Sequence, residues 1–261
     1  MSDLLESREG GVAVLTMNRP DRMNALSRPM LDALLQSLRR LAEDASIGAV
    51  VLTGTGRGFC AGGDVKAMAE SAGGEVLEER VHGLRARMEV SRLLHEMPKI
   101  TIAMINGPAA GAGLSMALAC DMRIAAESAK LTTAFIKVGF PGDFGGTYFL
   151  TKLIGTAKAR ELYYLADVVD ARQAAALGIV NRVVPDADLH KETMALAARI
   201  GSGPRIAYLH MKSALNVAES GSLMESFDTE AWGQSRCGET EDHKEAAKAF
   251  VEKRAPVFRG R

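Results

Sequence analysis

Two glycine-rich loops, about fifty residues apart, carry most of the chemical information in this chain. The first is Gly58–Asp64 (GFCAGGD) and the second is Asn106–Gly113 (NGPAAGAG). Each follows a short apolar run that indicates a buried strand, 49–53 or 100–105, and each precedes a segment that indicates a helix. A tight turn of small residues between a strand and a helix leaves backbone N–H groups free at the start of the helix. Two such turns side by side can aim two main-chain donors at one oxygen and stabilise charge that develops on a carbonyl.

Glycines that simply make turns account for either loop taken alone, and nucleotide binding is a further alternative. The dinucleotide fingerprint G-x-G-x-x-G requires a third glycine at a fixed offset. That offset holds Met116 after the glycines at 111 and 113, and Phe59 after those at 54 and 56. Neither loop ends in the Gly-Lys-Ser/Thr of a phosphate-binding P-loop. The residues therefore exclude both nucleotide interpretations.

Together with these loops, a series of further motifs makes the chain resemble the crotonase, or enoyl-CoA hydratase/isomerase, family over nearly its whole length. The motifs are TMNRP (16–20), NAL (24–26), VVLTG (50–54), CDMRIA (120–125), the segment 139–147, AALGIVN (175–181) and AFVEKR (249–254). The resemblance implies an α/β fold, a spiral of strand-strand-helix (ββα) units followed by a helical C-terminal region. It also implies an acyl-CoA thioester as substrate, with coenzyme A as part of the substrate and no separate cofactor.

The resemblance assigns the two oxyanion donors to the backbone N–H groups of Ala61 and Ala112. Ala112 replaces a glycine that is common in the family, and this change keeps the N–H. Gly62, Gly63 and Asp64 complete the first loop and are expected to line the substrate, with Asp64 acting as a helix cap that shapes the loop. The oxygen between the two donors is expected to be the thioester carbonyl, where an enolate forms.

The family's hydratases hold water with two glutamates, and the matching positions here are Ser115 and Phe135. Both carboxylates are absent, as in the isomerases of phenylacetate breakdown, which the chain resembles most in its motifs. Asp143 stands where several family isomerases carry a catalytic aspartate, between the apolar Phe140 and Phe144. Desolvation there is expected to raise the pKa of Asp143 and make it a better proton shuttle. The alternative is that Asp143 only caps a helix.

Three more residues are binding candidates through the resemblance. Arg22 matches the N-terminal loop that meets the CoA phosphates, although a solvated charge is an equal alternative. Phe250 and Lys253 match C-terminal positions that reach the CoA of a neighbouring subunit. Residues 1–200 are therefore expected to form the spiral core with the acyl-CoA site, and 201–261 a helical oligomerisation region of a homotrimer or homohexamer.

Composition indicates an ordinary globular protein. Of the 261 residues, 47% are hydrophobic and 25% charged, and 32 basic residues balance 32 acidic ones, so nothing points to a nucleic-acid partner. The start of the sequence lacks the apolar stretch of a signal peptide, and no run reaches membrane-spanning length. The three cysteines are widely spaced, which suits free thiols, and the five histidines share no metal-ligand spacing. We expect a cytoplasmic protein without a metal or a membrane partner.

Hydrophobic periodicity predicts the elements that position these loops. Strands are expected at 11–17, 49–53, 100–105, 121–126 and 180–184, and helices at 28–44, 75–96 and 113–119. A flexible connector is expected at 71–74, and from 186 onward everything is expected to be helical, with breaks at 201–204 and near 221.

Three classes of function remain open on the residues alone. The leading one is an acyl-CoA enzyme that stabilises a thioester enolate and moves a proton, with isomerisation favoured over hydration because both glutamates are missing. A hydratase that positions water in another way is the alternative within the family. A serine hydrolase would require Ser115 with histidine and aspartate partners, but no G-x-S-x-G motif is present. A CoA-binding protein without catalytic activity is the third class.

Overall fold

The structure is a computed structural model that describes residues 2–66 and 76–261, so the connector expected at 71–74 lies outside the described residues. The strands are β1 (Leu4–Glu9), β2 (Val12–Met17), β3 (Ala49–Gly54), β4 (Ile100–Ile105), β5 (Ala109–Ala110), β6 (Met122–Ala126), β7 (Lys130–Thr132), β8 (Val169–Asp170) and β9 (Arg182–Val184). The α-helices are α1 (Arg28–Glu43), α3 (Leu77–Arg87), α4 (Glu89–Glu96), α5 (Ala112–Ala119), α6 (Gly146–Ile154), α7 (Thr156–Leu165), α8 (Ala171–Ala176), α9 (Leu189–Gly201), α10 (Arg205–Ala218), α11 (Leu223–Gly238) and α12 (Glu241–Glu252). Short 3-10 helices cover Pro20–Arg22, Phe135–Val138 and Asp186–Asp188.

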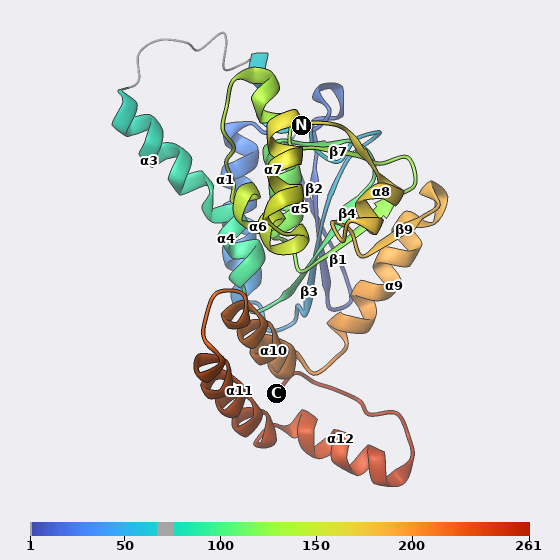
Figure 1. Ribbon diagram of the computed structural model, residues 1–261. Coiled ribbons are helices and arrows are strands. Elements are labelled where there is room, and N and C mark those ends of the chain that lie inside the picture. The colour runs from blue at the N-terminus through green and yellow to red at the C-terminus, as the bar shows by residue number, and fades with distance from the viewer. Residues whose placement is uncertain (1, 67–75) are drawn as a thin grey trace.

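The main sheet has six strands in the order β1-β2-β3-β4-β6-β9, and only the β1–β2 pair is antiparallel. Its central strands are buried on both faces, as the continuous apolar runs of β3 and β4 require. Because side chains alternate along a strand, Val50 and Leu52 pack on one face with the residues of α1. Val51 points to the other face and packs with Ile102 and residues of α9. The helices thus cover both faces of the sheet (Figure 1).

A second, smaller sheet runs β5-β7-β8 and begins inside the second glycine loop. Its strands are only two or three residues long, and β5 pairs with β7 in parallel. The first loop joins it through a bridge between Cys60 and Ala109. The two glycine loops, which follow neighbouring strands β3 and β4, are thereby hydrogen-bonded to each other.

Most of the predicted elements are confirmed, with short shifts at their ends. Helix α1 begins after Ser27, whose hydroxyl accepts a hydrogen bond from the Met30 N–H, and it buries Leu34, Leu38 and Leu41. The helix expected over 75–96 is two helices, because α3 and α4 meet at Met88. The N-terminal strand β1, the three strands of the small sheet and the helices α6 to α8 were not predicted.

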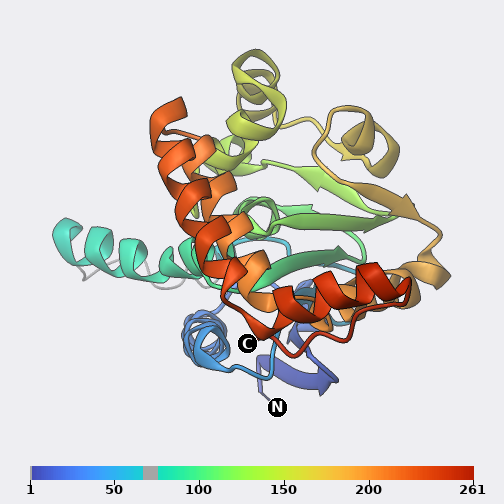
Figure 2. The ribbon, with the colours of Figure 1, turned by 90° about the horizontal axis from the view of Figure 1, so that it is seen from below.

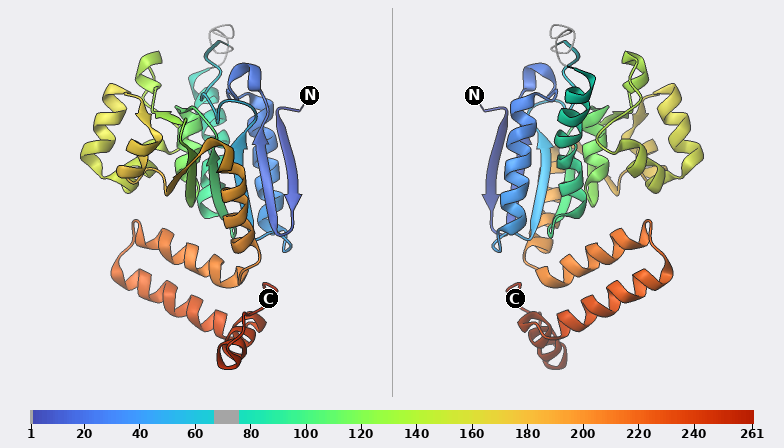
Figure 3. Two further views of the ribbon diagram at one scale, coloured as in Figure 1. Left: turned by 90° about the vertical axis from the view of Figure 1, so that its right-hand side faces the viewer. Right: turned by 90° about the vertical axis from the view of Figure 1, so that its left-hand side faces the viewer.

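The C-terminal helices α10, α11 and α12 lie beneath the layered core rather than within it (Figure 3). Seen from below, they extend across the underside of the sheets (Figure 2). One buried side chain ties α10 to the core: Lys212 is 4% exposed and donates to Asp121 Oδ2 at 2.8 Å and to the carbonyls of Leu94 and Lys99, both at 3.0 Å. The expected breaks near 201–204 and 221 are confirmed, and α11 and α12 are separated by a further break at 239–240.

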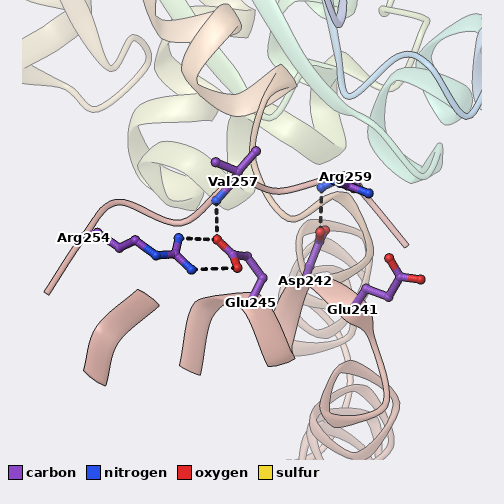
Figure 4. A pocket seen from close by; sticks show the side chains of 6 residues that line it. All are labelled: Glu241, Asp242, Glu245, Arg254, Val257 and Arg259. Carbon is purple, nitrogen blue, oxygen red and sulfur yellow. Dashed lines mark hydrogen bonds and ion pairs between the residues drawn. The ribbon is translucent and has the colours of Figure 1, made fainter. Parts of the chain in front are cut away.

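After α12 the last residues of the chain fold back along that helix (Figure 4). Arg254 pairs with both carboxylate oxygens of Glu245, at 2.6 and 3.0 Å. The buried Asp242 accepts hydrogen bonds from the N–H groups of Arg259 and Gly260, at 2.6 and 2.8 Å. These carboxylates lie around a cavity, but their oxygens are already engaged by the tail, so the arrangement is a structural clasp rather than a ligand site.

Candidate active site

Two asparagines hold the first glycine loop in place. Asn24 is fully buried, and its amide donates to the carbonyls of Thr55 and Gly58 at 2.9 and 2.8 Å. Asn106, at the start of the second loop, donates to the carbonyls of Gly54 and Gly56, both at 2.9 Å. Since these contacts satisfy the inward-facing carbonyls, the N–H groups further along the loop are presented in a defined direction.

The backbone N–H that the sequence assigned as the first oxyanion donor is already in use. The N–H of Ala61 donates to the carbonyl of Met23 at 2.9 Å. Two residues later, Gly63 bridges Leu26 in a parallel pair, and the hydrogen bond on this side runs from the Leu26 N–H to the carbonyl of Gly62 at 2.8 Å. Within the described residues, the N–H of Gly63 has no acceptor. Gly63, rather than Ala61, therefore carries the free donor of the first loop in this structure.

The second donor lies at the start of α5. Gly111 is the N-cap residue with φ +52°, and the N–H of Ala112 opens the helix. A Cβ added to Gly62 would lie 3.4 Å from the Ala112 nitrogen, so the Gly62–Gly63 backbone runs directly beside this donor. A Cβ on Gly113 would lie 2.5 Å from the carbonyl oxygen of Cys60, which explains why the contact needs glycine. In the part of the chain that the structure describes, neither the Gly63 nor the Ala112 N–H has an acceptor, so the two loops place two available N–H groups next to each other, as expected of an oxyanion hole.

Behind the second donor lies a polar contact between α5 and α7. Ser115 is 1% exposed, and its hydroxyl donates to the carbonyl of Gly111 at 3.2 Å. A Cβ on Gly146 would lie 2.3 Å from Ser115 Oγ and 2.4 Å from the Tyr163 hydroxyl oxygen, so both oxygens converge on a space that only glycine leaves open. The ring of Phe135 stacks on that of Tyr163, with the centroids 6.1 Å apart. Within the described residues, no histidine is hydrogen-bonded to Ser115, so a serine-hydrolase triad is absent there.

Asp143 lies on the same side of the site, in a loop of unusual backbone conformation. Gly142, Phe144 and Gly145 all have positive φ angles, which for Phe144 is a strained conformation (φ +50°). Within the described residues, Asp143 Oδ1 is buried without a hydrogen-bond partner, and burial raises the pKa of the carboxyl to about 6. Of the two flanking rings, Phe144 is buried, whereas Phe140 is half exposed.

The helix-capping alternative for Asp143 does not hold. Helix α6 begins after Gly145, which is its N-cap residue, and no side chain caps it. The N–H of Gly146 donates to the backbone carbonyl of Asp143, not to its carboxylate. The carboxylate of Asp143 therefore does not cap α6.

A cavity of about 380 Å³ lies beside this loop, between α4, α6 and α10. Phe144 and Gly145, which directly follow Asp143, form one wall, and His95 and Phe149 form another. Ser91 also lines it, with a buried hydroxyl that lacks a partner within the described residues. The cavity is an open hollow next to the loop that carries the carboxylate.

Comparisons with known proteins point to one family over nearly the whole chain. The sequence profile described as enoyl-CoA hydratase/isomerase matches residues 7–261. The 1,2-epoxyphenylacetyl-CoA isomerase of Escherichia coli is 36% identical over 261 residues, 100% of both chains, and the crotonyl-CoA hydratase of Syntrophomonas wolfei is 35% identical over 257 residues, 98% of this chain and 97% of that protein. The crystal structure of an enoyl-CoA hydratase from Bacillus anthracis superposes with a TM-score of 0.93 at 32% identity, covering 99% of this chain and 100% of that one.

This chain belongs to the crotonase family. The expected α/β crotonase fold with a helical C-terminal region is confirmed, and the chain is a hydratase/isomerase-family enzyme of acyl-CoA substrates. Relatives of nearly equal identity carry hydratase and isomerase names. Overall similarity therefore does not decide between the two reactions.

The other candidate residues of this crotonase lie in different parts of the structure. Asp64 is held at the end of the first loop by Arg19. The guanidinium of Arg19 donates to Asp64 Oδ2 at 2.9 Å and to the carbonyl of Ala25 at 2.7 Å, and these two contacts fix the loop. Arg22 is exposed, and its guanidinium lies 3.9 Å from the carboxylate of Asp21. Phe250 is 86% exposed on α12, and the exposed Lys253 ends that helix. Figure 1 shows α12 below the layered core, well away from α5, the helix that follows the second loop.

Tyr163 was missed in the sequence analysis. It lies in the last turn of α7, and no local pattern connects it with Ser115, which precedes it by almost fifty residues. Only the missing side chain of Gly146 brings the two hydroxyls together. Within the described residues, no group of three or more histidines, cysteines or carboxylates is placed to hold a metal ion. Nor does that part of the chain contain a helix of the length and apolarity needed to cross a bilayer.

Proposed function

We propose that this crotonase is an enoyl-CoA isomerase that moves a double bond through a thioester enolate. The observation that carries the proposal is the half-buried Asp143, whose buried Oδ1 has no partner within the described residues, in a site where Ser115 and Phe135 occupy the two glutamate positions of the hydratases. A single carboxylate can remove and return a proton, whereas activating water in the family's usual way requires two.

In this mechanism the thioester oxygen accepts hydrogen bonds from the N–H groups of Gly63 and Ala112. The ionised Asp143 removes a proton from the carbon next to the thioester carbonyl. The electron pair of the broken C–H bond then moves onto the thioester oxygen, and an enolate forms. The protonated Asp143 then returns the proton to another carbon of the conjugated chain, and the double bond is left in its new position. A pKa near 6 suits both directions, because the carboxyl exchanges protons readily near neutral pH.

The cavity beside Phe144 and Gly145 is the proposed place for the acyl group beyond the reacting carbons. Residues 201–261 are the proposed assembly region of a homotrimer or homohexamer. In that assembly Phe250 and Lys253 contact the CoA of a neighbouring subunit, and Arg22 contacts the phosphates of the CoA bound by its own chain. Their exposure on the isolated chain supports this role.

The test is a panel of 2-enoyl-CoA and 3-enoyl-CoA thioesters, assayed separately for double-bond migration and for water addition. Migration is expected to be fast, and hydration of crotonyl-CoA slow compared with a family member that has both glutamates. Fast hydration by the natural protein would show that another arrangement positions water, and would overturn the isomerase proposal. A structure with a bound acyl-CoA tests the donors directly: the thioester oxygen is expected within hydrogen-bond distance of the Gly63 nitrogen, not that of Ala61.

A further inference from the structure

The oxyanion donor at Ala112 belongs to a peptide group whose carbonyl accepts two hydrogen bonds. The N–H of Ala112 and the carbonyl of Gly111 form one peptide unit. That carbonyl accepts two hydrogen bonds from one residue, from the Ser115 N–H at 2.9 Å and from the Ser115 hydroxyl at 3.2 Å. Donation to a peptide carbonyl draws electron density from the peptide nitrogen and makes its N–H a stronger donor, which is the cooperative effect known for hydrogen-bond chains.

The chain extends one step further, to Tyr163. Because the hydroxyl proton of Ser115 goes to Gly111, its oxygen is left to accept a hydrogen bond. The oxygens of Tyr163 and Ser115 converge where Gly146 has no side chain, so the Tyr163 hydroxyl is placed to donate to Ser115 Oγ. Ser115 is almost fully buried, so water does not compete strongly with this contact.

Two other roles for Tyr163 fit the structure less well. A partner for Asp143 is one, but Asp143 Oδ1 has no hydrogen bond, so the tyrosine does not serve that oxygen. Simple packing is the other. The stacking on Phe135 does fix the ring, yet an apolar ring would stack equally well, and stacking does not explain why the Tyr163 hydroxyl converges with that of the buried Ser115.

We propose that Tyr163 and Ser115 form a hydrogen-bonded relay that polarises the Gly111–Ala112 peptide and strengthens the Ala112 N–H as a donor to the substrate oxyanion. The inference rests on the proposed function, since it requires an oxyanion at Ala112. Both side chains are positioning residues, because they act on the substrate through the peptide and not by contact. The hydroxyl of Ser115 thus has a use in the site although the carboxylate of the hydratases is missing.

The test compares Ser115→Ala, Tyr163→Phe and the double variant, with Tyr164→Phe as the matched control, since Tyr164 is the next residue on α7 and is 72% exposed. Carbonyl polarisation is read from the red shift in absorbance of cinnamoyl-CoA when it binds, and turnover from kcat and KM for a 3-enoyl-CoA. The red shift is expected to be smaller in Tyr163→Phe than in the natural protein and smaller still in Ser115→Ala. It is expected to stay unchanged in Tyr164→Phe. For Ser115→Ala kcat is expected to fall about two- to tenfold, the effect of one neutral hydrogen bond. For Tyr163→Phe the fall is expected to be about twofold, since the cooperative effect is a fraction of one bond.

Three outcomes separate the relay from other roles. Because Tyr163 acts through Ser115, adding Tyr163→Phe to Ser115→Ala is expected to cause no further loss, and additive losses would overturn the relay. A shifted midpoint in the pH profile of Tyr163→Phe would show that the tyrosine acts on Asp143 instead. An unchanged red shift in both single variants, with the natural protein showing one, would also overturn the relay. If the natural protein binds cinnamoyl-CoA without any red shift, the oxyanion hole itself fails, and the proposed function fails with it.

Discussion

The core that carries the glycine loops and the C-terminal helices differ in how they bury their side chains and pair their polar groups. In the core, Asn24 and Asn106 satisfy the carbonyls of the first loop, and the strands behind it are fully buried. Helices α10 to α12 instead expose large apolar side chains, namely Met211, Leu215, Leu223, Met224, Phe227, Trp232, Phe250 and Val251. Large exposed apolar surfaces of this kind are typical of sites that contact another molecule. The comparison teaches that the glycine loops and Asp143 are positioned by contacts within one chain, whereas the C-terminal helices leave a large apolar surface without contacts inside the described chain.

The largest expected effect comes from breaking the tether between the two regions. Lys212→Met leaves Asp121 as a partly buried carboxylate without its ammonium partner, and unfolding free energy is expected to fall by about 3–5 kcal/mol. Urea denaturation measures the loss. Adding Asp121→Asn is expected to restore part of it, because the unpaired charge is then gone. A loss below 1 kcal/mol in the single variant would show that α10 is held mainly by its other contacts.

The next prediction separates chemistry from assembly. Asp143→Asn is expected to lower isomerisation about a hundredfold or more, the usual contribution of a general base, with assembly unchanged by sedimentation. The natural enzyme is expected to lose activity as pH falls through about 6, where the carboxylate becomes protonated. Near-normal turnover by the Asn variant would show that another group moves the proton.

The same substitution has an expected effect on stability, and its sign follows from the raised pKa. Between the unfolded value of 3.8 and the folded value of about 6, the folded state binds the proton more tightly. The natural protein therefore loses stability as pH rises through this window, and above it the buried charge remains a cost. Asp143→Asn is expected to melt at a higher temperature than the natural protein at pH 7 and at a similar one at pH 4. A lower melting temperature at pH 7 would contradict burial as the cause of the shift.

The role of the exposed apolar surface of the C-terminal helices in self-association can be tested by placing one charged side chain on it. Trp232→Glu on α11 is expected to weaken self-association about thirtyfold, the effect of losing a central aromatic contact, while the circular dichroism of the core persists. Leu5→Glu on β1 is the control, an exposed apolar residue of the core that is expected to leave association unchanged. A natural protein that sediments as a monomer at micromolar concentration would contradict the assembly proposal as a whole.

The smallest effect is expected at the clasp around α12. Asp242→Asn weakens the acceptor for the N–H groups of Arg259 and Gly260, and the local cost is expected to be about 1 kcal/mol. Hydrogen exchange at 259–261 is expected to accelerate, with no change in the strands of the core. Faster exchange in β3 or β4 as well would show that the two regions are more strongly coupled than their contacts indicate.

The sequence alone determined the features that depend on local pattern. Apolar residues at helical spacing from Met30 to Leu41 predicted α1, and continuous apolar runs predicted β3 and β4, because periodicity reports which faces a segment buries. Residue types also decided the missing carboxylates at 115 and 135, since no fold can supply a charge that the side chain lacks. The short strands β5, β7 and β8 escaped prediction because two or three residues contain no period.

Tertiary structure alone decided which of these groups are free to act. The N–H of Ala61 looked as available as that of Gly63 until the carbonyl of Met23, almost forty residues away in the chain, was seen to take it. Likewise, Asp143 was freed from a capping role only because α6 begins after Gly145. Residue types and spacing determine which hydrogen-bond donors and acceptors a chain contains. Whether each donor or acceptor remains available to a substrate depends on partners that only the folded chain brings within hydrogen-bond distance.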